Sequence, residues 1–250
     1  MIRGSQNKYI ADNPVDFSQG FNLEDININE DNGSYSFTSS GISFTQVITR
    51  DSRNHPEFPT SGSRSIWTST LSGSFLGGNQ DYHKHELDFN WFTPLHKKFT
   101  ISQIFKMGIL EKIEDTDGER SIIPPSARFI MGGTGIPYGE MLRGYTENRI
   151  GPFGSTRGGD VMLKYSLELR LSLSENPTIY ALSFFDMGNV WSNFDVIDPF
   201  DLKRSSGFGI RIFVPMLGML GYDIGYGFDT IDETTEPHGW DHHLIFGMPF

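Results

Sequence analysis

The chain has 250 residues, a formal net charge of −11 and no cysteine. This length is enough for one large domain or two small ones, and the lack of cysteine excludes disulfides and thiolate metal sites. The acidic charge, with no run of Lys and Arg, argues against a nucleic-acid partner, and no stretch of roughly 18 to 20 apolar residues predicts a transmembrane helix.

The composition favours strands and turns over helices. Aromatic residues make up 14% of the chain, which also contains 28 glycines. Aromatic residues are enriched in strands, and glycines in turns. A membrane β-barrel is compatible with this composition, because only every second residue of its strands faces lipid.

The first forty residues are polar and acidic and have little periodicity. We expect residues 1–40 to be mostly an external loop, with at most a strand remnant at Met1–Ile10.

From residue 41 onward, apolar and polar side chains alternate with period two, which predicts strands. The alternation is clearest in Asp160–Leu173, where every odd position is apolar and every even position except Met162 is polar. The segments with this pattern are Gly41–Arg50, Ser63–Ser72, Tyr82–Thr93, Lys98–Ile113, Asp160–Leu173, Thr178–Trp191, Ser205–Val214, Met219–Asp229 and Gly239–Phe250. Their lengths are close to the roughly 9 to 11 residues that cross a bilayer at a tilt.

The connections between these segments alternate between mostly tight turns and longer polar loops, the longest being Glu114–Gly159. A soluble β-sandwich also has alternating strands. However, outer-membrane barrels combine short periplasmic turns, long external loops, an apolar outer face and a charged inner face. We therefore predict an all-β fold, an antiparallel transmembrane β-barrel of the outer membrane, in which 41–250 form about nine strands and 114–159 a long loop. Residues 1–250 would make one barrel region.

Six glycines share the polar, inward parity of the last strands, which would leave room for a loop backbone beside them. They are Gly188, Gly207, Gly209, Gly221, Gly225 and Gly227. Enlarging Gly209 or Gly225 is expected to expel such a loop.

Two groups of polar residues resemble parts of a metal site and a hydrolase site, but their patterns do not predict either site. Adjacent histidines on a strand point to opposite faces, so a metal site is not expected in the group His238, Asp241, His242 and His243. Asp51 and His55 resemble part of a hydrolase site, but no Gly-x-Ser-x-Gly motif accompanies them. We expect no enzyme activity, metal or cofactor.

Several ordered motifs give the chain a resemblance to a known family. They are TRDSRNHPEFPTSGSR (Thr49–Arg64), PPSARFIMGGTG (Pro124–Gly135), LRGYTENRIGP (Leu142–Pro152), FFDMGNVW (Phe184–Trp191) and GFGIRIFVPMLGML (Gly207–Leu220). With these motifs, the chain resembles the BamA superfamily of outer-membrane proteins. That family also includes TamA, the two-partner secretion translocators and the chloroplast import pore.

The resemblance implies a contact inside the barrel. In the family, the loop with the Arg-Gly-aromatic tripeptide folds inward and its arginine pairs with the aspartate of a later Phe-x-Asp-x-Gly motif. Here Arg143 would pair with Asp186, while Gly144 allows a tight turn and Tyr145 packs beside it. From its place on the polar face of the preceding strand, Glu168 is a second candidate partner, since a guanidinium can bind carboxylates on two sides.

The strand parity supports this pairing in part. Asp186 shares its parity with Tyr180 and Gly188, but the apolar Leu182 and Phe184 have the same parity and blur the pattern. For Arg149 and Arg157 the sequence suggests no role.

The terminal strand is the second functional element that the resemblance implies. Family members and many barrel proteins end in an aromatic residue on an alternating strand, which the assembly machinery recognises. Leu244, Phe246, Met248 and Phe250 fit this signal, whereas Pro249 departs from it. In the family, a weak closing seam is thought to be a lateral gate, and a proline suits a strand end where pairing is weak.

The implied function is the insertion and folding of β-barrel proteins in the outer membrane. The implied partners are the lipid bilayer, unfolded outer-membrane β-barrel substrates, periplasmic chaperones and accessory lipoproteins of an assembly complex. One alternative is a protein-translocating pore of the two-partner secretion or TamA type. Another is the barrel anchor of a patatin-like phospholipase. Because family barrels have sixteen strands and preceding POTRA domains, we expect a fragment of a longer protein, or less readily a barrel closed by oligomerisation.

Overall fold

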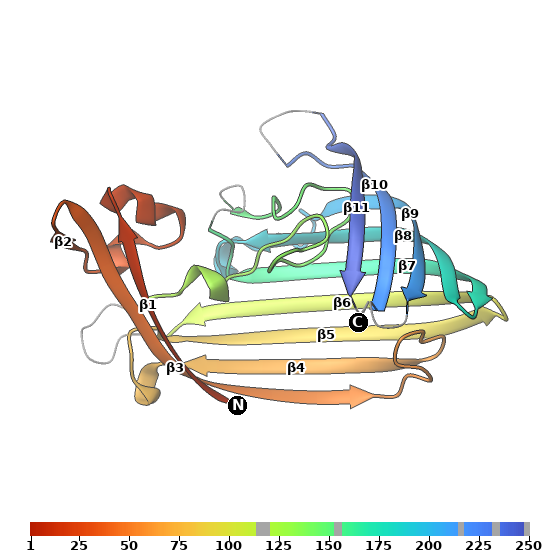
Figure 1. Cartoon of the computed structure of the whole chain (residues 1–250), viewed down its shortest axis with the longest axis horizontal. Coiled ribbons are helices and arrows are strands. Elements are labelled where there is room, and N and C mark those ends of the chain that lie inside the picture. Colours follow the sequence, from red (N-terminus) through yellow and green to blue (C-terminus); the bar gives the residue numbers. More distant parts are fainter. Residues whose placement is uncertain (114–120, 153–156, 215–217, 232–235, 248–250) are drawn as a thin grey trace.

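The computed structural model describes residues 1–250 except 114–120, 153–156, 215–217, 232–235 and 248–250. Its strands form one antiparallel sheet, which confirms the predicted all-β fold (Figure 1). The strands are β1 (Ile2–Ala11), β2 (Asn29–Asp31), β3 (Ser34–Asp51), β4 (Gly62–Ser72), β5 (Tyr82–His96), β6 (Phe99–Lys112), β7 (Val161–Glu175), β8 (Thr178–Trp191), β9 (Lys203–Val214), β10 (Gly218–Gly227) and β11 (Gly239–Gly247). Short 3-10 helices lie at Pro14–Gln19, Leu23–Asp25, Ser74–Leu76, Pro125–Ala127 and Phe194–Val196.

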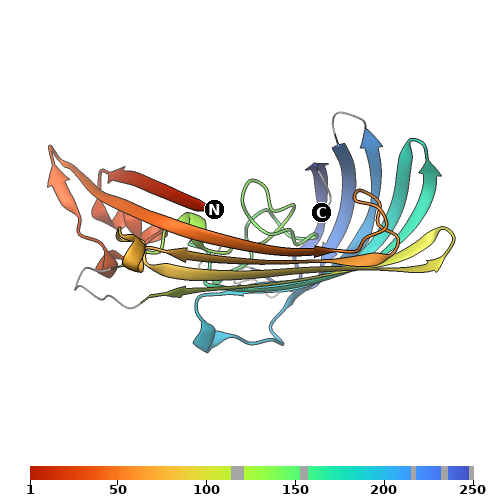
Figure 2. The ribbon, with the colours of Figure 1, turned by 90° about the horizontal axis from the view of Figure 1, so that it is seen from below.

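Each strand from β3 to β11 pairs with its neighbours in sequence, as in an up-and-down barrel. Among the described strands, β1 and β11 are not paired with each other, so the sheet is open between them. Figure 2 shows that the sheet curls on its C-terminal side. No helix in the described part of the chain is long and apolar enough to cross a membrane.

The N-terminal region has more strand than the prediction for residues 1–40, which was mostly an external loop with at most a strand remnant at Met1–Ile10. β1 occupies Ile2–Ala11 and pairs with Tyr35–Phe44 of β3. Together with β2 it brings the strands in the described residues to eleven, against about nine predicted. Nearly every side chain of β1 is exposed. Backbone pairing therefore forms this strand without a buried face, and its sequence lacks the alternation that revealed the others.

The two faces of the sheet have opposite chemistry. On β7 the inward side chains of Lys164, Ser166, Glu168 and Arg170 are buried, while the outward Leu167 and Leu169 stay partly exposed. The outward Phe208 and Phe246 are 69% and 64% exposed. An apolar outer face with charges inside is what a barrel in lipid requires.

The long connection between β6 and β7 crosses the inner face of the sheet (Figures 1 and 2). Single β-bridges join parts of this loop to one another, among them Met131 with Ile150 and Gly133 with Leu142. Met131, Leu142 and Tyr145 are fully buried in a cluster that also includes Leu110 of β6 and Val190 of β8. This apolar packing brings the predicted functional loop against the sheet.

Candidate functional site

Arg143 lies inside the curved sheet and is only 2% exposed. Its neighbours Leu142 and Tyr145 are fully buried. Gly144 has a φ of 81°, a left-handed conformation that favours glycine. The backbone thus turns sharply after Arg143, and its side chain points at the inner face of β7, β8 and β10.

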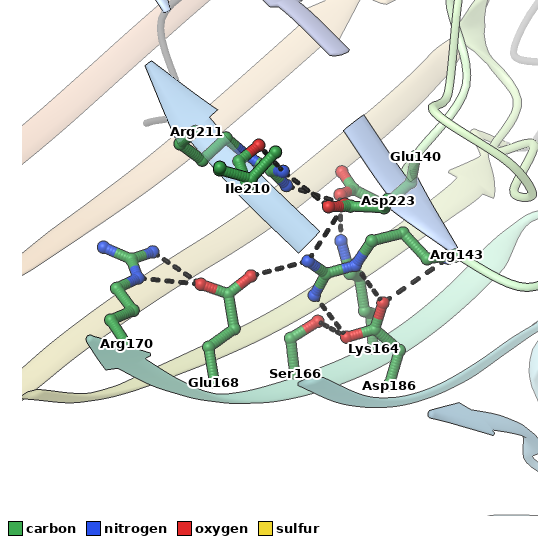
Figure 3. Close-up of polar contacts among 10 residues, drawn as sticks. All are labelled: Glu140, Arg143, Lys164, Ser166, Glu168, Arg170, Asp186, Ile210, Arg211 and Asp223. Atoms are coloured by element: carbon green, nitrogen blue, oxygen red, sulfur yellow. Dashed lines mark hydrogen bonds and ion pairs between the residues drawn. The ribbon is translucent and has the colours of Figure 1, made fainter. Parts of the chain in front are cut away.

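The structure brings Arg143 together with both carboxylates that the sequence suggested (Figure 3). Arg143 Nε and Nη2 donate to Asp186 Oδ2 and Oδ1 at 2.7 and 2.8 Å, and Nη1 lies 2.8 Å from Glu168 Oε1. Ser166 Oγ donates to Asp186 Oδ1 at 2.6 Å. We call Arg143, Gly144 and Tyr145 with Asp186 and Glu168 the loop clamp.

Further charged residues surround the loop clamp and were not predicted as part of it. Arg170 donates to Glu168 Oε2 through Nε and Nη2 at 2.8 and 2.7 Å. Arg211 forms a bidentate pair with Asp223, which lies 3.4 Å from Arg143 Nη1. Three guanidinium groups thus face three carboxylates, and their formal charges cancel in a buried space where an unmatched charge would be costly.

Phe184 explains the exception in the parity of β8. The Cζ atom of Arg143 lies 3.8 Å from the centre of the Phe184 ring, a cation–π contact that suits a planar guanidinium. An aromatic residue on the inward face is therefore part of the arginine's environment.

The loop has a second charged anchor at Glu140, which the sequence did not reveal. Its carboxylate lies 2.8 Å from Lys164 Nζ and 3.0 Å from Lys106 Nζ. The two lysines are directly opposite each other on β6 and β7, where like charges would repel without a carboxylate between them. Burial opposes ionisation of Glu140, but the two ammonium groups outweigh it and lower the pKa to about 2.

Tyr145 joins the loop to the rim formed by β9 and β10. Its hydroxyl donates to the carbonyl of Arg204 at 2.6 Å and accepts from the amide of Asp229 at 3.3 Å. Burial raises the pKa of Tyr145 far above its ordinary value. The phenol therefore stays protonated and can donate.

The six inward glycines divide into two groups. A Cβ on Gly225 would lie 2.7 Å from the amide nitrogen of Gly144, and one on Gly188 would lie 2.8 Å from the sulfur of Met131 in the same loop. Gly227 also adjoins the loop, at Gly144 and Tyr145. Gly207, Gly209 and Gly221 instead make room for side chains of the site or for strand backbone, and Gly209 faces Asp223.

The histidine group is divided between the two faces of β11. His243 is buried and its Nε2 accepts the amide hydrogen of Gly144 at 2.8 Å. His242 points outward, 2.8 Å from the hydroxyl of Tyr222. Asp51 and His55 form turn contacts, the first with Arg53 and the second with the amides of Glu57 and Phe58.

The terminal strand is described only in part. Leu244 and Phe246 point outward and are 60% and 64% exposed. Met248, Pro249 and Phe250 lie outside the described residues. Arg149 borders a cavity of about 410 Å³ beside Trp191, and Arg157 is half-buried.

Three comparisons relate this chain to known proteins. The model of the Omp85 superfamily domain matches residues 4–243. The outer membrane protein assembly factor BamA of Nitratidesulfovibrio vulgaris (strain Hildenborough) is 28% identical over 81% of this chain and 25% of its own length. The chain therefore spans about a quarter of that relative.

A solved structure shares the fold. The crystal structure of BamA from Haemophilus ducreyi lacking POTRA domains 1-3 superimposes with a TM-score of 0.69 and 18% identity, over 98% of this chain and 50% of the other. The predicted outer-membrane barrel architecture is confirmed by these matches. Since the family model covers nearly the whole chain, this protein belongs to the Omp85 superfamily of outer-membrane β-barrel proteins.

Proposed function

We propose that this chain is the barrel part of a factor that inserts and folds β-barrel proteins in the outer membrane. The family supports outer-membrane protein assembly or a related function, and the curated relative is named as an assembly factor. The observation that carries the proposal is the loop clamp. It holds a long loop against the inner face through a buried, charge-balanced set of contacts.

The loop clamp is expected to keep the loop docked in the resting protein. Arg143, Asp186 and Glu168 are each at most 5% exposed, and separating them would leave buried charges unpaired. The loop therefore stays against the inner face of the sheet.

The proposed partners include the lipid bilayer and unfolded proteins. The outward face, with exposed residues such as Phe208 and Phe246, suits contact with the lipid bilayer. Unfolded outer-membrane β-barrel proteins would be the substrates, delivered by periplasmic chaperones and positioned by accessory lipoproteins of an assembly complex. No covalent chemistry is needed, because strand pairing and lipid burial drive folding.

Depletion of the protein in its own cells tests this function. Quantitative proteomics of the outer membrane should show a joint fall of many unrelated β-barrel proteins. Loss of one secreted protein, with the barrel proteins unchanged, would contradict assembly and indicate a secretion pore. Loss of a single lipase activity alone would indicate an enzyme anchor.

A further inference from the structure

The strand β11 lies at one end of the described sheet and pairs with β10 alone. Its register places His243 opposite Asp223 and Leu244 opposite Tyr222. His243 faces the inside and is 3% exposed, whereas Leu244 faces outward and is 60% exposed. The backbone ladder to β10 is the first attachment of this strand.

The loop provides a second attachment through side chains of β11 and the residue before it. Gly144 donates its amide hydrogen to Nε2 of His243 at 2.8 Å, across 99 residues of sequence. Next to this bond, Thr146 Oγ1 lies 3.3 Å from His238 Nε2, and the rings of Tyr145 and His238 are 5.4 Å apart. Three consecutive loop residues thus meet this end of the sheet.

The hydrogen bond between Gly144 and His243 fixes which ring nitrogen of His243 carries the hydrogen. An imidazole nitrogen that accepts a hydrogen bond carries no proton, so the ring of His243 is neutral with its hydrogen on Nδ1. The amide that it binds belongs to Gly144, which follows Arg143 directly. The loop clamp, which holds Arg143, therefore also orients the amide of Gly144.

We propose that His243 is a positioning residue that ties the terminal strand β11 to the loop clamp. The position of β11 then depends on whether the loop is docked, and not only on its pairing with β10. This deepens the proposed function and rests on it for its consequence. A loop that holds or releases β11 would control the sheet edge available to an incoming strand.

Hydrogen exchange, measured by mass spectrometry on the full-length protein in lipid nanodiscs, tests the tie. His243→Leu removes the acceptor and is expected to speed exchange about tenfold in the peptides that contain Gly144 and β11. Peptides of β7 and β8 should keep their wild-type rates. His242→Leu is the matched control, because His242 precedes it on the same strand and faces outward, and it should leave Gly144 unchanged.

Equal exchange in wild type and His243→Leu, or the same acceleration in both histidine variants, would overturn the tie. If His243→Leu does not fold, the pair His243→Gln and His243→Asn decides. Glutamine reaches the position of Nε2 with an acceptor oxygen, while asparagine reaches only that of Nδ1. Protection should survive in the first and fall in the second, and equal protection in both would reject the proposal.

A cleavable crosslink offers an independent rescue. The chain has no cysteine, so Thr146→Cys with His238→Cys can be joined, without competing thiols, by a short bis-maleimide whose spacer contains a disulfide. The native side chains at the two positions are in contact. In His243→Leu the crosslink should restore slow exchange in β11, and a reduced sample should lose it again. Because exchange reports the tie itself, these results do not depend on the depletion experiment that tests assembly.

Discussion

The loop that crosses the inner face is held by two charged anchors of different character. At Arg143 the side chains of the arginine and Asp186 are 2% and 0% exposed, and the guanidinium is shared among β7, β8 and β10. At Glu140 the carboxylate is 19% exposed and binds two lysines of β6 and β7. The side chains of the first anchor are almost wholly shielded from solvent, whereas the carboxylate of the second is partly exposed. The ion pairs of the two anchors are therefore not expected to contribute equally to loop docking.

Arg143→Ala should have the largest effect. It leaves Asp186, Glu168 and Asp223 without a shared cation in a buried space, which costs about 3–5 kcal/mol of docking free energy. We expect the loop to leave the inner face. Met141 lines the internal cavity, so Met141→Cys in this cysteine-free chain should react faster with a maleimide.

Two variants control this experiment. Arg143→Lys keeps the charge but loses the planar fork, and is expected to restore docking only in part. Arg3→Ala removes an exposed arginine of β1 and should leave the labelling rate unchanged. Slow labelling in Arg143→Ala would show that the apolar cluster holds the loop without the clamp.

The double mutant Arg143→Ala with Asp186→Ala sharpens the comparison. If the two residues act as a pair, the double mutant should be little worse than either single mutant, so that the coupling energy is nearly as large as the loss in one single mutant. The same labelling rate, converted to a docking free energy, measures it. Fully additive losses would mean that Arg143 and Asp186 act separately.

Gly225→Ala should disturb the clamp through its backbone. The added Cβ would lie 2.7 Å from the nitrogen of Gly144, and overpacking of this kind costs about 1–3 kcal/mol. Gly4→Ala is the control, because a Cβ there meets no atom within 4 Å. Faster labelling in both variants, or in neither, would show that the close approach of Gly225 to Gly144 does not contribute to loop docking.

Parity along the strands predicted much of this site. The alternation of β7 and β8 placed Glu168 and Asp186 on the inner face, and the family resemblance supplied their partner Arg143. Asp223 and Arg211 have the same inward parity on β10 and β9. Their pairing stayed hidden because the sequence gives the face of a residue but not the register that sets two of them together.

Other features depend on contacts that leave no periodic signal. Glu140 belongs to an irregular loop, so its partners Lys106 and Lys164 could be found only once β6 and β7 were in register. The strand β1 was predicted only as a remnant, because it buries almost none of its side chains. The role of Phe184 was also not predicted, because an apolar residue on a polar face has no evident function until Arg143 is seen to lie over its ring.

Glu140→Gln should have a smaller effect than any change at Arg143. The amide can still accept hydrogen bonds from the lysines, and water can reach the site, so we expect a loss of about 1 kcal/mol. A modest rise in the labelling rate of Met141→Cys would show it. Glu236→Gln, on an exposed loop residue, should change nothing, and a loss at Glu140 as large as that of Arg143→Ala would contradict the ranking of the two anchors.

The pH dependence of the Glu140 anchor is the smallest expected effect. Its pKa is lowered from the ordinary 4.5 to about 2, so its contribution to docking is complete above about pH 4.5 and fades as the pH falls towards 2. The difference in docking free energy between wild type and Glu140→Gln should therefore be constant from pH 8 to 5. A difference that already shrinks between pH 7 and 5 would mean that the two lysines do not hold the carboxylate in its charged form. Because the comparison uses the same loop in both proteins, titration of groups that do not contact Glu140 cancels, and what remains reports Glu140 and its two lysines.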